Sequence, residues 1–210
     1  MTKYISLLQL KGGAGKSTLA INLIGYFISK NKRVLGVDGD LKQGTLTAWS
    51  HLFQHKNYTC VGINTLDELI AVLTEADEKY DLVITDLPPR LADIARSSLV
   101  FSDLVLMPVT TSAPDIWAAA DISPLIEAAK KEKDVNLRIV WNRYKPTRRK
   151  EDLKTSSKEY LGHKEMNQTI SDYVAYSDVV GMGTWVGAHN HVKAKAEFLQ
   201  FAKEVEKLIK

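Results

Sequence analysis

Residues 11–18 read Lys11-Gly12-Gly13-Ala14-Gly15-Lys16-Ser17-Thr18, and this stretch decides the fold. It follows an apolar run at residues 5–10 and precedes an apolar segment with helical periodicity. Glycines allow consecutive backbone N–H groups to turn toward an anion, and the start of the following helix adds partial positive charge. Lys16 would reach the β and γ phosphates of a nucleotide, and Ser17 would offer a hydroxyl to Mg²⁺. The stretch therefore predicts a phosphate-binding loop between a strand and a helix.

Short apolar runs alternate with longer segments along the rest of the chain. We predict buried strands at residues 5–10, 34–37, 82–85, 104–107 and 137–141. We predict helices at residues 17–29, 65–79, 112–132 with an interruption near Pro124, 150–161 and 192–209. This alternation favours an α/β fold, in which a mostly parallel twisted sheet carries helices on both faces. In such sheets ligands bind beyond the carboxyl ends of the strands.

The composition is that of a globular protein. The chain has 210 residues, of which 45% are hydrophobic and 25% charged, with a formal net charge of +3. We expect one domain over residues 1–210, and no apolar run approaches the ~18 residues that a membrane span needs. The sequence also lacks a cleavable signal, so we expect a cytoplasmic protein. Cys60 is the single cysteine, which excludes an intrachain disulfide, a zinc site built on several cysteines and an intrachain iron–sulfur cage.

Carboxylates follow two of the predicted strands. The run 34–37 leads into Asp38-Gly39-Asp40, and the run 82–85 leads into Asp86. Carboxylate oxygens are the hard ligands that Mg²⁺ prefers, and a carboxylate there can also orient an attacking water. The sequence therefore predicts a magnesium and hydrolysis site beside the phosphate loop.

The phosphate loop departs from the usual pattern G-x-x-x-x-G-K-[ST], because Leu10 stands in place of the first glycine and Lys11 adds a second cation. This is a deviant Walker A loop, and the apolar strand that ends in Asp86 has the form of a Walker B element. Over nearly its whole length the chain resembles the ParA/MinD family of dimerising ATPases, and most closely the small ParA-type plasmid and chromosome partition proteins. The resemblance implies a P-loop NTPase fold of the deviant Walker type, ATP and Mg²⁺ as cofactors, and a homodimer formed with ATP.

The same resemblance assigns roles to individual residues. Lys11 would reach across the dimer to phosphates held by the other subunit, and a charge supplied in this way would stabilise the transferring phosphoryl group. Asp40 matches the family's hydrolytic aspartate, and with Lys11 and Lys16 it makes up the catalytic set. The residues implied in nucleotide binding are Lys11, Gly12, Gly13, Ala14, Gly15, Lys16, Ser17, Thr18 and Asn142, the last of these contacting the base. The residues implied in metal binding are Ser17, Asp38, Asp40 and Asp86, with Asp38 in the outer shell.

Two further features concern the switch loops. The family usually reads D-x-D-P-Q, whereas this chain continues from Asp40 with Leu41-Lys42-Gln43, without the proline and with one extra residue. Pro88 and Pro89 would stiffen the end of the Walker B strand, as a loop that senses the γ-phosphate requires. Residues 102–110 resemble the family strand that precedes a dimer-facing helix.

The basic excess lies toward the C-terminus. Residues 143–158 contain seven basic and two acidic side chains. A run of this kind is often only a solvated face, but small ParA proteins bind DNA non-specifically through this region and near the C-terminus, and phosphate contacts need no sequence readout. The predicted DNA-binding residues are Arg143, Lys145, Arg148, Arg149, Lys150, Lys193 and Lys195.

The function predicted by the resemblance is DNA partition. ATP would form a sandwich dimer on nucleoid DNA, and a centromere-binding, ParB-like adaptor would stimulate hydrolysis and release. One alternative is a MinD-like membrane switch anchored by the amphipathic segment 192–209, although both signs of charge on its polar face favour packing on the sheet instead. The other is a ligase of the dethiobiotin-synthetase type, against which Lys11 argues.

Overall fold

The computed structural model describes residues 1–88 and 92–210, and Pro89, one of the two prolines of the predicted switch loop, lies outside them. The strands are β1 (Lys3–Leu7), β2 (Val34–Asp38), β3 (Tyr58–Gly62), β4 (Leu82–Asp86), β5 (Leu104–Val109) and β6 (Leu137–Trp141). The α-helices are α1 (Lys16–Ser29), α2 (Thr45–Leu52), α3 (Leu66–Ala76), α4 (Ala92–Phe101), α5 (Ala113–Ala120), α6 (Ser123–Lys130), α7 (Arg148–Leu161), α8 (Ala175–Gly181) and α9 (Val192–Leu208). A short 3₁₀ turn, η1 (Val186–Ala188), precedes α9.

The strands form one six-stranded parallel sheet in the order β3-β2-β4-β1-β5-β6. The predicted α/β fold is therefore confirmed. The chain builds outward from β1 to β2 and β3, returns with β4, and then crosses β1 to add β5 and β6 on the other side. Because the connections after β1 and β4 run in opposite directions, a crevice opens at the carboxyl end of β1, where the phosphate loop begins.

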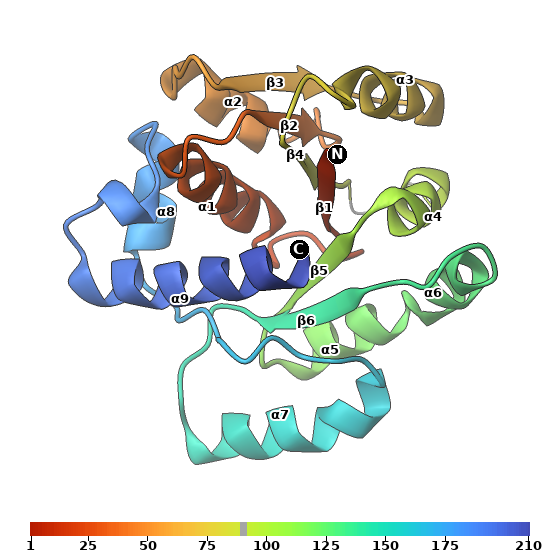
Figure 1. Cartoon of the computed structure of the whole chain (residues 1–210). Coiled ribbons are helices and arrows are strands. Elements are labelled where there is room, and N and C mark those ends of the chain that lie inside the picture. Colours follow the sequence, from red (N-terminus) through yellow and green to blue (C-terminus); the bar gives the residue numbers. More distant parts are fainter. Residues whose placement is uncertain (89–91) are drawn as a thin grey trace.

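Alternate strand residues face two separate apolar cores. In β4, Leu82 and Ile84 join the core under α1, α2, α8 and α9, whereas Val83 faces the core under α3 to α7. Figure 1 shows α1, α8 and α9 gathered on one side of the sheet and α4 and α6 on the other. This burial on both faces explains why the strands read as continuous apolar runs.

The structure differs from the sequence prediction at several elements. Strand β1 ends at Leu7 rather than at residue 10, because Gln9 turns its side-chain amide to the Pro108 carbonyl as the loop begins. The edge strand β3 and the helices α2, α4 and α8 were not predicted, since they are short and carry weak periodicity. The predicted helix at 112–132 is two helices, α5 and α6, which separate just before Pro124 as expected.

Helix α9 packs on the sheet. Its apolar residues Phe198, Phe201 and Val205 are fully buried in the same core as Leu19 and Leu23 of α1. This face is the one that a membrane anchor would need to expose. Among the described residues, no helix is both long enough and apolar enough to cross a bilayer.

Candidate nucleotide-binding site

The loop between β1 and α1 has the backbone of a phosphate cradle. Gly13 and Gly15 adopt φ values of 80° and 94°, a region that residues with a Cβ rarely occupy. A Cβ built on Gly12 or Gly13 would meet no atom within 4 Å, so the loop faces open space that a phosphate chain can fill. A Cβ on Gly15 would lie 2.2 Å from Nδ2 of Asn142, so this position also requires glycine for space.

Lys16 begins α1 at the floor of this cradle and is only 7% exposed. Burial lowers its pKa, while the carboxylates of Asp86 and Asp40 act in the opposite direction. The ammonium is therefore held close to the strand-end acids. A buried cation at a helix N-terminus in an open glycine loop is suited to phosphate oxygens.

Asp38 and Asp86 end neighbouring strands and are register partners in the sheet. Burial raises the pKa of Asp86 to about 7, and Asp38 and Asp40 add to the rise, whereas a hydrogen bond from Ser17 and the charge of Lys16 oppose it. Oδ1 of Asp86 is buried and has no hydrogen-bond partner within residues 1–88 and 92–210. A carboxylate oxygen orphaned beside the Ser17 hydroxyl fits a divalent cation, because a cation would offset both the burial and the repulsion between acids.

The Mg²⁺ site is not a closed cage of side chains. The described residues form no cluster of three or more His, Cys, Asp or Glu side chains that could hold a metal ion. Ser17 and Asp86 would therefore supply only part of a coordination shell. Mg²⁺ normally takes its remaining ligands from nucleotide phosphates and water, which suits this arrangement.

The structure places Asp38 and Asp40 differently. Both oxygens of Asp38, which is fully buried, are occupied: Oδ1 accepts from the Asp40 backbone N–H at 3.0 Å, and Oδ2 accepts from the backbone N–H and hydroxyl of Thr47 at 2.9 and 2.7 Å. Asp38 therefore fastens the start of α2 to the end of β2. Asp40 lies partly exposed beyond the strand, with its carboxylate near Lys16.

A cavity of about 440 Å³ lies next to the phosphate loop. It is bounded by Gly13, Gly15 and Thr18 on one side and by the segment 171–177 on the other. Asn142 also lines it, and its amide donates to the Ala14 carbonyl at 2.7 Å, so its side chain braces the loop. Sequence reasoning missed the segment 171–177, because it carries no motif and reaches the cavity only through the path of the chain after α7.

Lys11 is held within its own chain. Its ammonium forms an ion pair with Asp115 in the first turn of α5, and the side chain of Lys11 is 42% exposed. A second cavity, of about 400 Å³, is lined by Lys11, Gly12 and Asp115 and also by Lys150 of α7. Asp115 was missed from the sequence. The only available signal was its place after the helix-capping Ser112, which is typical of ordinary helix starts.

The predicted DNA-binding residues fall into three groups. Arg143 and Lys145 border the cavity of about 440 Å³ next to the phosphate loop. Both form ion pairs with Asp172, at 3.2 and 2.8 Å, which hold the pKa of that carboxyl below its usual value. Arg148, Arg149 and Lys150 form the first turn of α7, whereas Lys193 and Lys195 lie in the first turn of α9. Helices α7 and α9 pack on opposite faces of the sheet.

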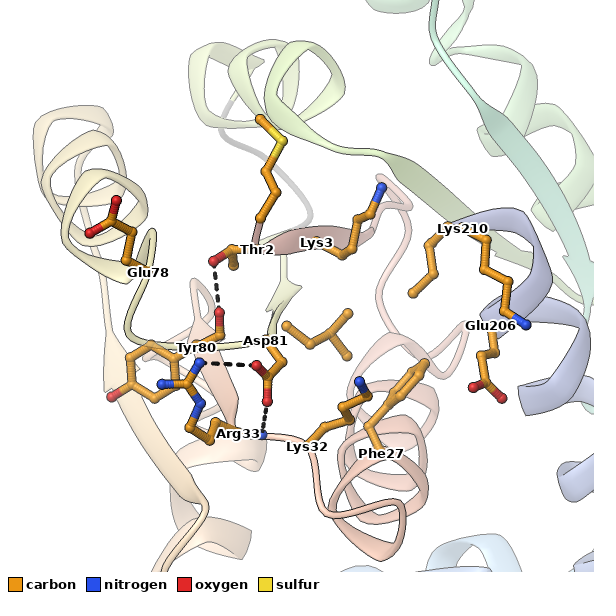
Figure 2. A pocket seen from close by; sticks show the side chains of 13 residues that line it. Thr2, Lys3, Phe27, Lys32, Arg33, Glu78, Tyr80, Asp81, Glu206 and Lys210 are labelled. Atoms are coloured by element: carbon orange, nitrogen blue, oxygen red, sulfur yellow. Dashed lines mark hydrogen bonds and ion pairs between the residues drawn. The ribbon is translucent and has the colours of Figure 1, made fainter.

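Another cavity, of about 350 Å³, opens at the opposite, amino edge of the sheet (Figure 2). Figure 2 shows Arg33 paired with Asp81, and the Thr2 hydroxyl bonded to the Tyr80 carbonyl. These groups satisfy one another. The cavity also lies far along the strands from the glycine loop, so the phosphate site is the candidate functional site.

The fold and site define a class: a parallel α/β protein with a deviant phosphate loop after its first strand and a Walker B aspartate on the neighbouring strand. A family model described as the CobQ/CobB/MinD/ParA nucleotide binding domain matches residues 5–182. The chain therefore belongs to this family. It is an ATPase of the ParA/MinD type, so its nucleotide is ATP, and the acids at the ends of its strands suit Mg²⁺.

Curated relatives and solved structures agree with this assignment. Maintenance of carboxysome distribution protein A (McdA) from Halothiobacillus neapolitanus is 28% identical over 186 residues, covering 87% of this chain and 85% of the relative. The chromosome-partitioning ATPase Soj from Thermus thermophilus is 29% identical over 167 residues, covering 66% and 67%. The structure of apo McdA from Cyanothece superposes with a TM-score of 0.80 at 17% identity, covering 98% of this chain and 100% of that one. MinD from Pyrococcus horikoshii with Mg-ADP gives a TM-score of 0.76 at 20% identity, covering 99% and 97%.

Proposed function

We propose that residues 1–210 act as a single-domain, ParA-type partition ATPase. ATP joins two copies into a sandwich dimer, and the dimer binds DNA without regard to sequence. Hydrolysis, stimulated by a centromere-binding, ParB-like adaptor, then releases the DNA. The protein would work in the cytoplasm, on the nucleoid.

The observation that carries this proposal is the cavity shared by Lys11, Gly12 and Lys150. It brings the phosphate loop and the first turn of the basic helix α7 to the same opening. The presence or loss of the γ-phosphate can therefore affect the position of α7 directly. This supports DNA binding that depends on the nucleotide.

The proposed DNA contacts centre on Arg148 and Arg149, because both are exposed and neither has an ion-pair partner among the described residues. Arg143 and Lys145 must first leave Asp172. Lys193 and Lys195 begin a helix on the other face and would add to the surface in the dimer. Two small patches gain affinity when dimerisation joins them, since the second then binds at a high effective concentration.

In the proposed active site each residue keeps the role expected above. Lys16, Thr18 and the glycines bind phosphates, and Asn142 contacts the base after releasing the Ala14 carbonyl. Ser17 and Asp86 hold Mg²⁺, with Asp38 in the outer shell, and Asp40 carries hydrolysis. Lys11 acts on the phosphates of the partner subunit.

A second candidate cargo is a protein body rather than DNA. It is supported by the match to McdA, whose name refers to carboxysome distribution and which covers more of this chain than Soj does. The ATP-driven switch and the DNA surface would be the same. Only the adaptor that stimulates hydrolysis would differ.

Fluorescence anisotropy on a labelled duplex tests the proposal with ATP, with ADP and without nucleotide, beside sedimentation with anionic phospholipid vesicles. We expect DNA binding with ATP alone, at the same affinity for two unrelated sequences, and no sedimentation with vesicles. Vesicle binding with ATP, together with no binding to DNA, would contradict the proposed role in DNA partition and would favour a MinD-like membrane switch instead.

A further inference from the structure

The segment 171–177, which lines the cavity of about 440 Å³ across from the phosphate loop, is fastened to α9 by the carboxylate of Glu197. Oε1 of Glu197 accepts from the backbone N–H of Ser171 at 2.9 Å and from the hydroxyl of Tyr176 at 2.8 Å. Oε2 accepts from the hydroxyl of Ser171 at 2.5 Å. Ser171 and Tyr176 both line the cavity, and Glu197 supports them from the helix behind.

The path of the backbone explains why an acceptor is needed at this place. In an extended segment, successive N–H groups point to opposite sides. The N–H groups of Ile170 and Asp172 donate to carbonyls at and just beyond the end of β6, at 2.9 and 3.2 Å. The N–H of Ser171 lies between them and is satisfied by Glu197 instead. The segment is therefore held from two directions, by the end of β6 and by α9.

The carboxylate also fixes the state of the Tyr176 phenol. Burial raises the pKa of Tyr176, and the charge of Glu197 and its hydrogen bond to the phenol add to the rise. The phenol therefore stays protonated at neutral pH and continues to donate. Hydrogen bonds to a charged acceptor are shorter and stronger than those between neutral groups, so Glu197 holds the segment firmly.

We propose that Glu197 is a positioning residue for the nucleoside: from α9 it holds the segment 171–177 at the distance from the phosphate loop at which the cavity accepts adenosine. This role rests on the proposed contact of Asn142 with the base, which puts the nucleoside in this cavity. Because the segment is fixed before the nucleotide arrives, less conformational freedom is lost on binding.

Helix α9 also carries a matched control, Glu204, about two turns after Glu197. Both side chains are half-buried, and the carboxylate of Glu204 accepts from the backbone N–H groups of Asn167 and Gln168 at 2.8 and 3.2 Å. Glu204 and Asn167 line a different cavity, of about 620 Å³. Loss of either carboxylate should therefore lower stability, but only the loss of Glu197 should weaken nucleotide binding.

The test compares ADP with inorganic pyrophosphate, both with Mg²⁺, by isothermal titration calorimetry. Pyrophosphate carries the two phosphates of ADP without the nucleoside, and ADP lacks the γ-phosphate on which the proposed dimer depends. Glu197→Ala should bind ADP about tenfold more weakly than the wild type and pyrophosphate equally well. Glu204→Ala should bind both as the wild type does. Urea denaturation should show that the two variants lose similar stability.

Substitutions that separate reach from charge provide a second test if the alanine variant folds poorly. Glu197→Gln keeps the reach and an oxygen that can accept from Ser171 and Tyr176, so it should bind ADP nearly as the wild type does. Glu197→Asp keeps the charge but withdraws the oxygens by one methylene, so it should bind ADP more weakly. The reverse order would mean that charge acts rather than position, and would overturn the proposal.

The outcomes separate this inference from the proposed function. If the wild type binds pyrophosphate as tightly as ADP, the nucleoside does not occupy this cavity, so the base contact of Asn142 is wrong and the role of Glu197 is overturned with it. If the wild type prefers ADP and Glu197→Ala retains its full affinity, only the positioning role is overturned. Equal losses of ADP affinity in the Glu197 and Glu204 variants, or equal losses for ADP and pyrophosphate in Glu197→Ala, would also overturn it, because they would indicate a general loss of structure.

Discussion

At the scale of single residues, the phosphate site depends on a few positions that are tightly surrounded by other atoms. Lys16 is buried beside Asp86 and Asp40, and Gly15 leaves no room for a Cβ against Asn142. Such positions tolerate little change, because the surrounding atoms already occupy the available space.

The first prediction concerns Lys16. Lys16→Ala should lower ATP affinity by about a hundredfold or more, since a charge-assisted bond to phosphate contributes up to ~3 kcal/mol. Isothermal titration calorimetry measures the loss, and Lys42→Ala, at an exposed position, is the control that should bind normally. Unchanged ATP affinity in Lys16→Ala would contradict the phosphate-loop assignment.

The second prediction concerns Asp40, whose carboxylate lies near Lys16 without fastening any element. Asp40→Ala should bind ATP normally but hydrolyse it about a hundredfold more slowly, because a group that orients the attacking water would be missing. Sedimentation should then find a persistent dimer with ATP, and phosphate release measures the rate. A variant that turns over ATP at the wild-type rate would exclude Asp40 from hydrolysis.

At the scale of secondary-structure elements, the helices beside the phosphate loop are held by hydrogen bonds at their first turns. The start of α2 is fixed by Asp38 at the end of β2, and the first turn of α5 by Ser112 and Asp115. These contacts place the helices around the phosphate loop. Losing these contacts would therefore affect both the stability of the fold and the function of the site.

The third prediction tests the bond between β2 and α2. Thr47→Val removes the hydroxyl that donates to the buried Asp38 carboxylate and should lower the free energy of unfolding by about 1–3 kcal/mol. Urea denaturation measures the change. Thr45→Val, in the same first turn and without that bond, should stay within about 0.5 kcal/mol of wild type. Equal stabilities of the two variants would contradict the structural role of Asp38.

The fourth prediction concerns α7. Replacing Arg148 and Arg149 by Glu should abolish ATP-dependent DNA binding and spare ATP binding, because the charges reverse on the exposed first turn of the helix. Removing Lys193 and Lys195 on their own should weaken DNA binding without abolishing it. Reversing Lys203 and Lys207, which are exposed near the other end of α9, is the control and should leave DNA binding near normal. Normal DNA binding by the α7 variant would indicate that the basic residues at 143–158 form only a solvated surface.

At the scale of the whole molecule, the sheet separates two apolar cores, one on each of its faces. The basic helix α7 belongs to one side and α9 to the other. A dimer that joins two such molecules would present several separated cations, which suits phosphate contacts spaced along a duplex.

The fifth prediction follows from that arrangement. If the joined surface makes ~6 phosphate contacts, the logarithm of affinity should fall with the logarithm of salt at a slope of about −5, or roughly a thousandfold between about 50 and 200 mM. Anisotropy titrations at several salt concentrations give the slope. A slope near zero would contradict binding through phosphates.

Much of the fold was predicted because its signals are local. The glycine loop, the apolar strands and the acids that end β2 and β4 lie within short stretches, and burial on both faces makes the strands conspicuous. Strand β3 was missed because it is an edge strand, partly exposed and with little apolar contrast. Helix α8 was missed because it is short and its apolar face is defined by tertiary packing against α1, η1 and α9.

The sequence by itself determined the phosphate loop, the order of strands and helices and the residue types at the strand ends, since each depends on neighbours along the chain. Only the tertiary structure decided which of those residues meet. Asn142 braces Ala14, 128 residues away, and Asp115 holds Lys11 because β5 lies beside β1. Such pairs follow from the order of strands across the sheet, and that order is set by packing of the two cores rather than by any local pattern.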